Sequence, residues 1–233
     1  MSKKLINEKW INLACGQNRV DHINSTTQQK DGVFFGVDIV KTDAVDAVID
    51  LEQFPWDIES ESAEELVCSH YVEHTPMETY GKRVLRAIKD SKNFEHLKML
   101  IDQIDESLPS DGLILFMDEC YRILKNEVID PNGDKHGGRM RIIAPYYSSA
   151  RCWQDPTHRR PIMEWTFMYF NKGWREQNRL DHYGIKSDFD FVYGYDLDQD
   201  IINRNDEYKT FAMRHYVNTV NDVIVTLTKR PAV

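Results

Sequence analysis

The chain has few cysteines, and their spacing excludes two common classes of protein. Cys15, Cys68, Cys120 and Cys152 are scattered along 233 residues and form no C-x-x-C pair. This pattern excludes a zinc ribbon and a disulfide framework. Cys15 and Cys68 lie within apolar runs, where a free cysteine usually packs as a small hydrophobe. A catalytic thiol is therefore the weaker interpretation.

The sequence also lacks long apolar runs and an excess of positive charge. No apolar run approaches the ~20 residues needed to cross a bilayer, and the first residues, MSKKLINEKW, do not read as a signal peptide. We therefore expect a cytoplasmic protein with no membrane partner. The net charge of −9 disfavours bulk nucleic-acid binding. The hydrophobic content of 41% is typical of a globular protein with one sizeable core.

Short apolar runs rich in β-branched residues alternate with longer helical stretches. The runs are nearly continuous, as expected for strands covered on both faces of a parallel sheet. Expected strands are 10–15, 34–40, 46–51, 65–70, 139–145, 189–197 and 222–230, and expected helical stretches are 77–90, 93–108 and 109–126. This order predicts an α/β fold. We interpret residues 1–233 as a single domain with a helical insertion at about 77–108 and a substrate-region segment at about 146–188.

Polar groups follow the first three expected strands in an ordered set. Gly16 follows the first strand and lets the backbone pass close to a ligand. Asp38 ends the second strand, 22 residues later, where an acidic side chain can accept hydrogen bonds from ribose hydroxyls. Asp50 and Leu51 end the third strand and could meet an adenine ring. Because parallel strands end at one sheet edge, we expect these residues to share a site.

These motifs resemble the class I S-adenosylmethionine-dependent methyltransferases over roughly residues 10–147. The resemblance is carried by INLACGQN, FGVDI, AVIDLEQFPW, LVCSHYVEHTP, DECYRILK and GGRMRIIAPYY. It implies a Rossmann-like seven-stranded, mostly parallel sheet with an antiparallel final strand and helices on both faces. The places of the family's glycine-rich first motif hold Asn12, Ala14, Gly16 and Asn18 here, so one glycine is kept.

The resemblance also implies S-adenosyl-L-methionine as cofactor and a methyl-transfer activity. Carried over position by position, the cofactor-binding residues would be Ala14, Cys15, Gly16, Asn18, Asp38, Ile39, Asp50, Leu51, Ser69 and His70. Ser69 and His70 would lie beside the methionine part of the cofactor.

The string His70-Tyr-Val-Glu73-His74 matches an inverted zinc-protease pattern, H-x-x-E-H. A zinc site would need both histidines on one helix, but a strand precedes His70 and Pro76 follows closely. No later segment offers an obvious third ligand. The sequence therefore predicts no metal.

The segment after the fifth strand is rich in polar and aromatic residues, and in the family this region contributes to the acceptor pocket. His158 is the candidate general base, since histidine titrates near neutral pH, and Asp155 could orient it. The structural alternative, in which Asp155 caps a turn and His158 is structural, is equally open. Arg159 and Arg160 could bind an anionic acceptor, or form a solvated surface pair. The acceptor itself is not identified by the sequence.

Two other functions compete with a methyltransferase. One is a dinucleotide-dependent Rossmann oxidoreductase of the NAD type, which INLACGQN disfavours because the later glycines are missing. The other is a non-catalytic relative that binds the cofactor, or a partner protein, through the same pocket.

Overall fold

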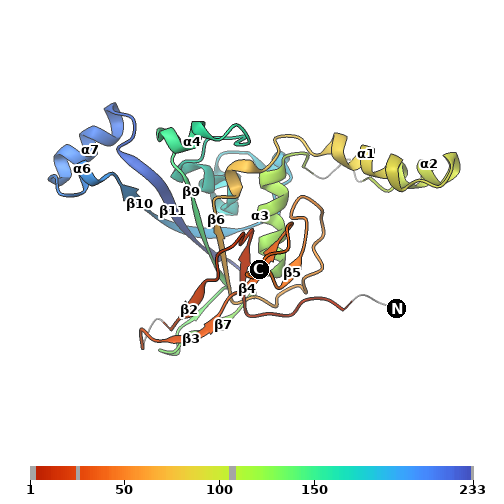
Figure 1. Ribbon diagram of the computed structural model, residues 1–233, viewed down its shortest axis with the longest axis horizontal. Helices are drawn as coiled ribbons and strands as arrows, with labels where there is room; N and C mark the ends of the chain where they lie inside the picture. The colour runs from red at the N-terminus through yellow and green to blue at the C-terminus, as the bar shows by residue number, and fades with distance from the viewer. Residues whose placement is uncertain (1–3, 25–26, 105–108, 232–233) are drawn as a thin grey trace.

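The protein is built on one seven-stranded sheet, seen in a computed structural model that describes residues 4–24, 27–104 and 109–231 (Figure 1). The strand order is β10-β11-β9-β6-β1-β4-β5. The strands are β1 (Trp10–Leu13), β4 (Phe35–Asp38), β5 (Ala47–Val48), β6 (Glu65–Ser69), β9 (Arg139–Pro145), β10 (Phe189–Leu197) and β11 (Val220–Lys229). All seven strands predicted from the apolar runs are confirmed.

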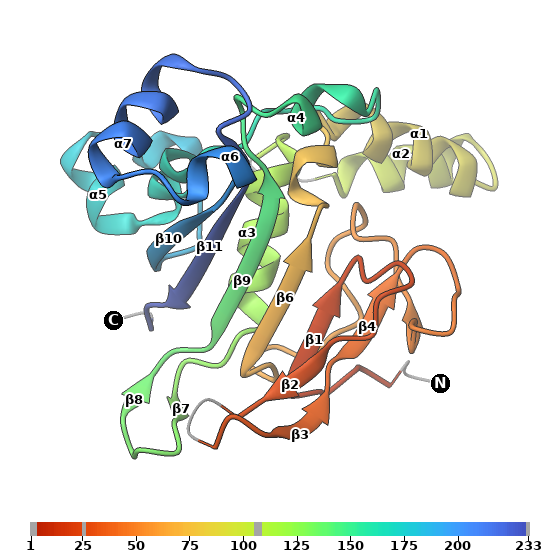
Figure 2. The same ribbon diagram turned by 60° about the vertical axis from the view of Figure 1, so that its left-hand side comes forward.

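The strand directions also match the expectation. β1 pairs in parallel with β4 and β6, β4 with β5, and β6 with β9. The final strand, β11, is antiparallel to both β9 and β10, between which it lies. The carboxyl ends of the parallel strands therefore share one edge, which is the upper edge in Figure 2.

Helix α3 (Gly112–Ile123) supplies the main helical side of the core. Asp111 caps its first turn, accepting hydrogen bonds from the backbone N–H groups of residues 113 and 114. Phe116, Cys120 and Ile123 are fully buried in one cluster with sheet residues such as Leu66 and Met140. The other α-helices are α1 (Tyr80–Asp90), α2 (Phe94–Asp102), α4 (Ala150–Gln154), α5 (Lys172–Gln177), α6 (Gln199–Ile202) and α7 (Asp206–His215), with 3-10 turns η1 (Val72–His74), η2 (Glu164–Phe170) and η3 (Asp181–Tyr183).

The connection from β1 to β4 departs from a regular doubly wound fold, because it forms a hairpin of β2 (Asp21–Ile23) and β3 (Lys30–Val33). Trp10 of β1 stacks on His22 of the hairpin, with ring centroids 3.9 Å apart. On the sheet face away from α3, Arg139, Arg141 and Val192 are exposed. The helical cover is therefore uneven between the two faces.

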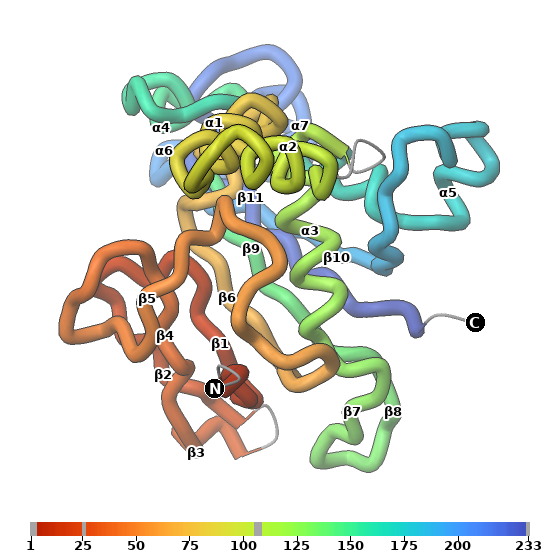
Figure 3. The backbone as a smooth tube through the Cα atoms, turned by 90° about the vertical axis from the view of Figure 1, so that its right-hand side faces the viewer, coloured from red at the N-terminus to blue at the C-terminus, as the bar shows by residue number. Residues whose placement is uncertain are grey.

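Loops and helices gather at the carboxyl edge, whereas hairpins occupy the opposite edge. Figures 2 and 3 show α1, α2, α4, α6 and α7 above the strand ends, with β2–β3 and the hairpin of β7 (Val128–Ile129) and β8 (Lys135–His136) below. Helices α1 and α2, here called the helical arm, extend away from the sheet (Figure 1). They account for most of the predicted insertion, whose end at 105–108 lies outside the described residues. In the described part of the chain, no helix combines the length and apolarity needed to cross a membrane.

Candidate functional site

The turn after β1 is tied directly to the end of β4. The backbone takes the left-handed conformation at Ala14 (φ 54°) and at Gly16 (φ 56°), which bends the chain sharply. The Gly16 N–H donates to Asp38 Oδ2 at 2.8 Å, and the Val40 N–H donates to Asp38 Oδ1 at 3.0 Å. The carboxylate of Asp38 is thus held in one orientation by two backbone donors, with lone pairs left for a ligand.

Asn12 and Cys15 stabilise this turn through buried side chains. Asn12 is buried and its Nδ2 donates to the carbonyl oxygen of Asn18 at 3.2 Å. The Cys15 side chain is buried in a small cluster with Ala44 and Val45. Burial, and secondarily the charge of Asp38, raises the pKa of the Cys15 thiol. Cys15 and Asn18, both predicted as cofactor residues, therefore contribute to the backbone of the turn rather than to a cavity wall.

A cavity of about 280 Å³, here called the edge cavity, opens beside this turn. Its walls are Ala14, Asp38, Ile39, Ile49, Asp50, Leu51, Glu52 and Tyr71. The cavity combines carboxylates with apolar surface, including Ile39, a residue that is 61% exposed. Such a combination suits a nucleoside, because carboxylates accept hydrogen bonds from hydroxyl and amino groups while apolar walls contact the base.

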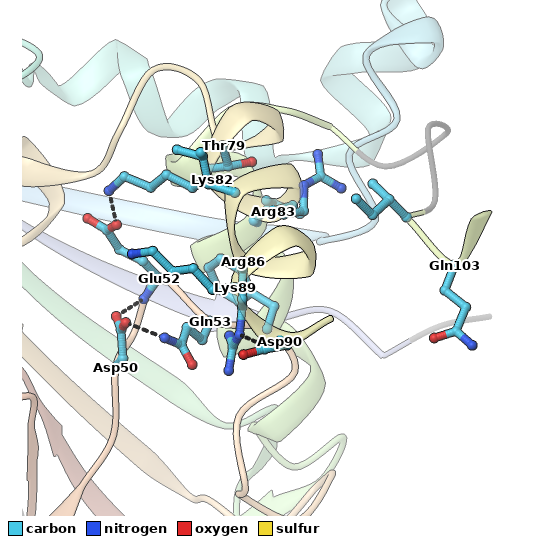
Figure 4. A pocket seen from close by; sticks show the side chains of 14 residues that line it. Asp50, Glu52, Gln53, Thr79, Lys82, Arg83, Arg86, Lys89, Asp90 and Gln103 are labelled. Atoms are coloured by element: carbon cyan, nitrogen blue, oxygen red, sulfur yellow. Dashed lines mark hydrogen bonds and ion pairs between the residues drawn. The ribbon is translucent and has the colours of Figure 1, made fainter. Parts of the chain in front are cut away.

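Asp50, which also lines the edge cavity, has its carboxylate oriented by hydrogen bonds, as Asp38 does. Its Oδ1 accepts from the Glu52 N–H at 3.0 Å and its Oδ2 accepts from Gln53 Nε2 at 2.7 Å (Figure 4). Ala14, Asp38, Ile39, Asp50 and Leu51 thus come together as predicted. Ser69 and His70 fall outside the residues that line this cavity.

Three residues of the edge cavity were not predicted from the sequence: Ile49, Glu52 and Tyr71. Tyr71 packs against Phe116, with ring centroids 5.3 Å apart, and burial raises the pKa of its hydroxyl well above the usual range. Glu52 also lines two neighbouring cavities. All three residues come within two positions of predicted ones, so their place just beyond a strand end was an available signal.

One neighbouring cavity, here called the arm cavity, lies between helix α1 and the loop after β5. Its volume is about 580 Å³. Lys82 of α1 forms an ion pair with Glu52, and Arg86 pairs with Asp90 at 3.6 Å (Figure 4). The first pair ties the helical arm to the rim of the edge cavity.

The other neighbouring cavity, here called the histidine cavity, has a volume of about 670 Å³. It is lined by Glu52, His74, Pro76, Met77, Glu78, Lys82, Thr157, His158 and Arg159. His158 and Arg159, both predicted for the acceptor side, therefore line a cavity that shares Glu52 with the edge cavity.

The predicted pairing of Asp155 with His158 is loose. Asp155 Oδ2 lies 3.9 Å from His158 Nε2, whereas Asp155 Oδ1 accepts from the Thr157 hydroxyl at 2.7 Å. Hydrogen bonds from Thr157 are the main reason that the pKa of Asp155 is lowered. The group that orients the His158 ring is the carbonyl oxygen of Cys152, 2.9 Å from Nδ1.

Arg160 is engaged within the protein. Its Nη1 donates to both carboxylate oxygens of Asp111 at 3.1 Å, and its Nη2 donates to the carbonyl oxygens of Thr75 and Pro76 at 3.2 and 3.0 Å. The side chain is only 12% exposed. This guanidinium therefore joins the loop after β6 to the start of α3, a structural task that differs from the predicted anion binding. Arg159 is exposed and remains a candidate for that task.

His70, at the end of β6, takes the left-handed conformation with φ 55°. Its Nδ1 lies 3.5 Å from Glu73 Oε1. The carboxylate of Glu73 is the main cause that raises the pKa of His70, against the opposing effect of burial.

Comparisons with known proteins bear on the fold. No protein-family model matches the chain, and no curated protein sequence matches it. A solved S-adenosylmethionine-dependent methyltransferase from Archaeoglobus fulgidus is similar with a TM-score of 0.50 and 13% identity, over 95% of this chain and 86% of that one. A putative methyltransferase from Bacillus halodurans has a TM-score of 0.43 and 12% identity, over 98% and 95% of the two chains. The strand order, the antiparallel β11 and the first of these similarities agree: the chain has the fold of the class I S-adenosylmethionine-dependent methyltransferases.

Proposed function

We propose that this protein is an S-adenosylmethionine-dependent methyltransferase whose cofactor binds in the edge cavity. The observation that carries the proposal is the pair of oriented carboxylates, Asp38 and Asp50, at the carboxyl edge of a methyltransferase-type sheet. Ligands of open α/β sheets bind at this edge. The solved protein from Archaeoglobus fulgidus is itself described as S-adenosylmethionine-dependent.

The residues of the edge cavity fit the parts of this cofactor. Asp38 would accept hydrogen bonds from the ribose hydroxyls, because its two backbone donors leave further lone pairs on both oxygens. Ile39 and Leu51 would cover the faces of the adenine ring, and Asp50 would accept from its amino group. Bound cofactor supplies a methyl group already activated on a sulfonium. The task left to this chain is to orient the acceptor and exclude water.

The structure disfavours a dinucleotide-dependent oxidoreductase. A pyrophosphate is usually held at the N-terminus of the helix that follows the first strand. In this protein the described residues between β1 and β4 form the hairpin β2–β3. The backbone N–H of Gly16, which could face a phosphate, is already donated to Asp38.

The acceptor would enter through the histidine cavity, which shares Glu52 with the edge cavity. Arg159 lines this cavity, is exposed, and would favour an acceptor with an anionic group. A non-catalytic protein that only binds the cofactor would use the same edge cavity, and methyl transfer to an acceptor separates the two.

Calorimetric titration tests the proposal. S-adenosylmethionine and S-adenosylhomocysteine should bind with a Kd in about the micromolar range, near −8 kcal/mol, whereas NAD should not bind. Asp38→Asn should raise the Kd of both sulfur nucleosides by about 10-fold or more, because a hydrogen bond to a charged group contributes roughly 1.5–3 kcal/mol.

Asp43→Asn is the matched control, since Asp43 is an exposed carboxylate of the loop after β4. It should leave both affinities unchanged. Absence of binding by either sulfur nucleoside, or equal binding of NAD, would refute the proposal.

A further inference from the structure

The carboxylate of Glu73 is buried in an unusual way. Glu73 lies in η1 directly after β6 and its side chain is fully buried. Among the described residues, neither of its carboxylate oxygens has a hydrogen-bond partner. Burying an ionised carboxylate is very unfavourable unless a cation or donors compensate it. A positive charge is therefore expected beside Glu73, either on a protonated histidine or on a bound cation.

Histidines surround this carboxylate. His158 Nε2 lies 4.0 Å from Glu73 Oε1 and His70 Nδ1 lies 3.5 Å from it. The rings of His74 and His158 meet edge to face, with centroids 4.6 Å apart. The ligand atoms of Glu73, His74 and His158 all lie within 4.8 Å of one another. His158, from a distant segment, thus meets two members of the H-x-x-E-H string, Glu73 and His74, and His70 is not part of this group.

The backbone fixes this encounter. The Arg159 N–H donates to the carbonyl oxygen of Glu73 at 2.7 Å, and Arg160 joins the same segment to Thr75 and Pro76. The loop that carries His158 is therefore fastened to the turn that carries Glu73 and His74.

Hydrogen bonds at the Nδ1 atoms of His74 and His158 fix the orientation of both rings. His158 Nδ1 donates to the carbonyl oxygen of Cys152, which leaves Nε2 as the nitrogen with a free lone pair, and Nε2 faces Glu73. His74 Nδ1 lies 3.0 Å from the Thr157 hydroxyl, whose proton is donated to Asp155. Metal-binding histidines usually donate a hydrogen bond from the N–H of their second ring nitrogen to a carbonyl, carboxylate or water oxygen.

We propose that Glu73, His74 and His158 bind one divalent transition-metal ion, of which Zn²⁺ is the best match. Two imidazoles and one carboxylate form a known donor set for zinc with an open position, and imidazole disfavours Mg²⁺ and Ca²⁺. Zinc bonds of about 2.0–2.1 Å place ligands about 3.4 Å apart, so the three side chains would approach one another by about 1 Å.

The role of the ion rests on the proposed function. His74 and His158 line the histidine cavity, so an open coordination position would face the acceptor side of the protein. The open position would bind an oxygen atom of the acceptor molecule, such as a hydroxyl or carboxylate oxygen. Because Glu52 lines both the histidine cavity and the edge cavity, the bound acceptor would lie next to the cofactor site. This assignment replaces the general-base role predicted for His158 and gives Asp155 and Thr157 the task of positioning His74.

Titration of the full chain, after treatment with a chelator, tests the site. Zn²⁺ should bind by calorimetry with a stoichiometry of one. Co²⁺ should bind at the same site and produce the d–d absorption of a four- or five-coordinate ion. His74→Asn and His158→Asn should each weaken Zn²⁺ by about 100-fold or more and abolish the Co²⁺ spectrum.

Two further variants make the result decisive. Glu73→Gln should remove binding while circular dichroism shows a folded protein; if this variant does not fold, the two histidine variants carry the test. His182→Asn, in an exposed turn, should leave binding unchanged. Lack of stoichiometric binding, or binding that the cluster variants do not alter, would overturn the proposal. Because this readout needs no cofactor, its failure is distinguishable from a failure to bind S-adenosylmethionine.

Discussion

Asp38 serves the fold and the candidate ligand site with the same two oxygens. It fixes the left-handed turn at Gly16 and the start of the loop at Val40. The same bonds hold the carboxylate in the orientation in which it lines the edge cavity. A side chain that is already oriented loses little conformational entropy when a ligand binds.

Arg160 and Arg159 provide a matched pair of arginines for a stability test. Arg160→Ala would remove bonds to Asp111, Thr75 and Pro76, leaving polar groups without their partner. We expect a loss of about 2–3 kcal/mol in the free energy of unfolding, measured by urea denaturation. Arg159→Ala changes an exposed neighbour and should cost less than about 0.5 kcal/mol. Equal effects of the two substitutions would contradict the structural role of Arg160.

At the scale of elements, the sequence predicted the strands whose residues follow a burial pattern and did not predict the strands that depend on tertiary contacts. The five strands β1, β4, β5, β6 and β9 are short, mainly apolar runs, and β11 alternates apolar with polar residues, so these patterns were readable. The strands β2 and β3 are the short, mixed segments DHI and KDGV, which carry no such pattern. They are held by the stacking of Trp10 on His22 and by a hydrogen bond between His22 Nδ1 and Asp31 Oδ1, and neither contact could be read from the segment itself.

Gly32 of β3 tests this view of the hairpin. A Cβ atom at Gly32 would come within 2.1 Å of the Trp10 ring, so Gly32→Ala must displace the ring from His22. The expected loss in the free energy of unfolding is about 1–3 kcal/mol. Gly194→Ala in β10, where a Cβ atom meets nothing within 4 Å, should change it by less than about 0.5 kcal/mol. Similar unfolding curves for the two variants would rule out close packing of the hairpin on β1.

At the scale of the whole molecule, the sites combine strand ends that are distant in sequence. The set Gly16, Asp38 and Asp50 was predictable because parallel strands end at one edge. The meeting of His158 with Glu73 and His74 was not, because it depends on a loop fastened across the sheet edge by Arg159 and Arg160. Sequence spacing contains no information about such a contact.

Ligand binding at the edge cavity should stabilise the whole molecule. A ligand at 100 times its Kd adds about 2.7 kcal/mol to the free energy of unfolding. For a chain of this size this corresponds to an increase of roughly 5–11 °C in Tm. Differential scanning fluorimetry should show this shift with S-adenosylhomocysteine and little shift with NAD. A Tm that does not change with S-adenosylhomocysteine concentration would argue against a specific site.

The most direct measurement is a crystal structure of the protein with S-adenosylhomocysteine. The proposed function predicts the ribose hydroxyls at Asp38, the adenine between Ile39 and Leu51, and the sulfur directed toward the histidine cavity. Ligand density in the arm cavity, or density in which Asp38 makes no contact with the ribose, would contradict it.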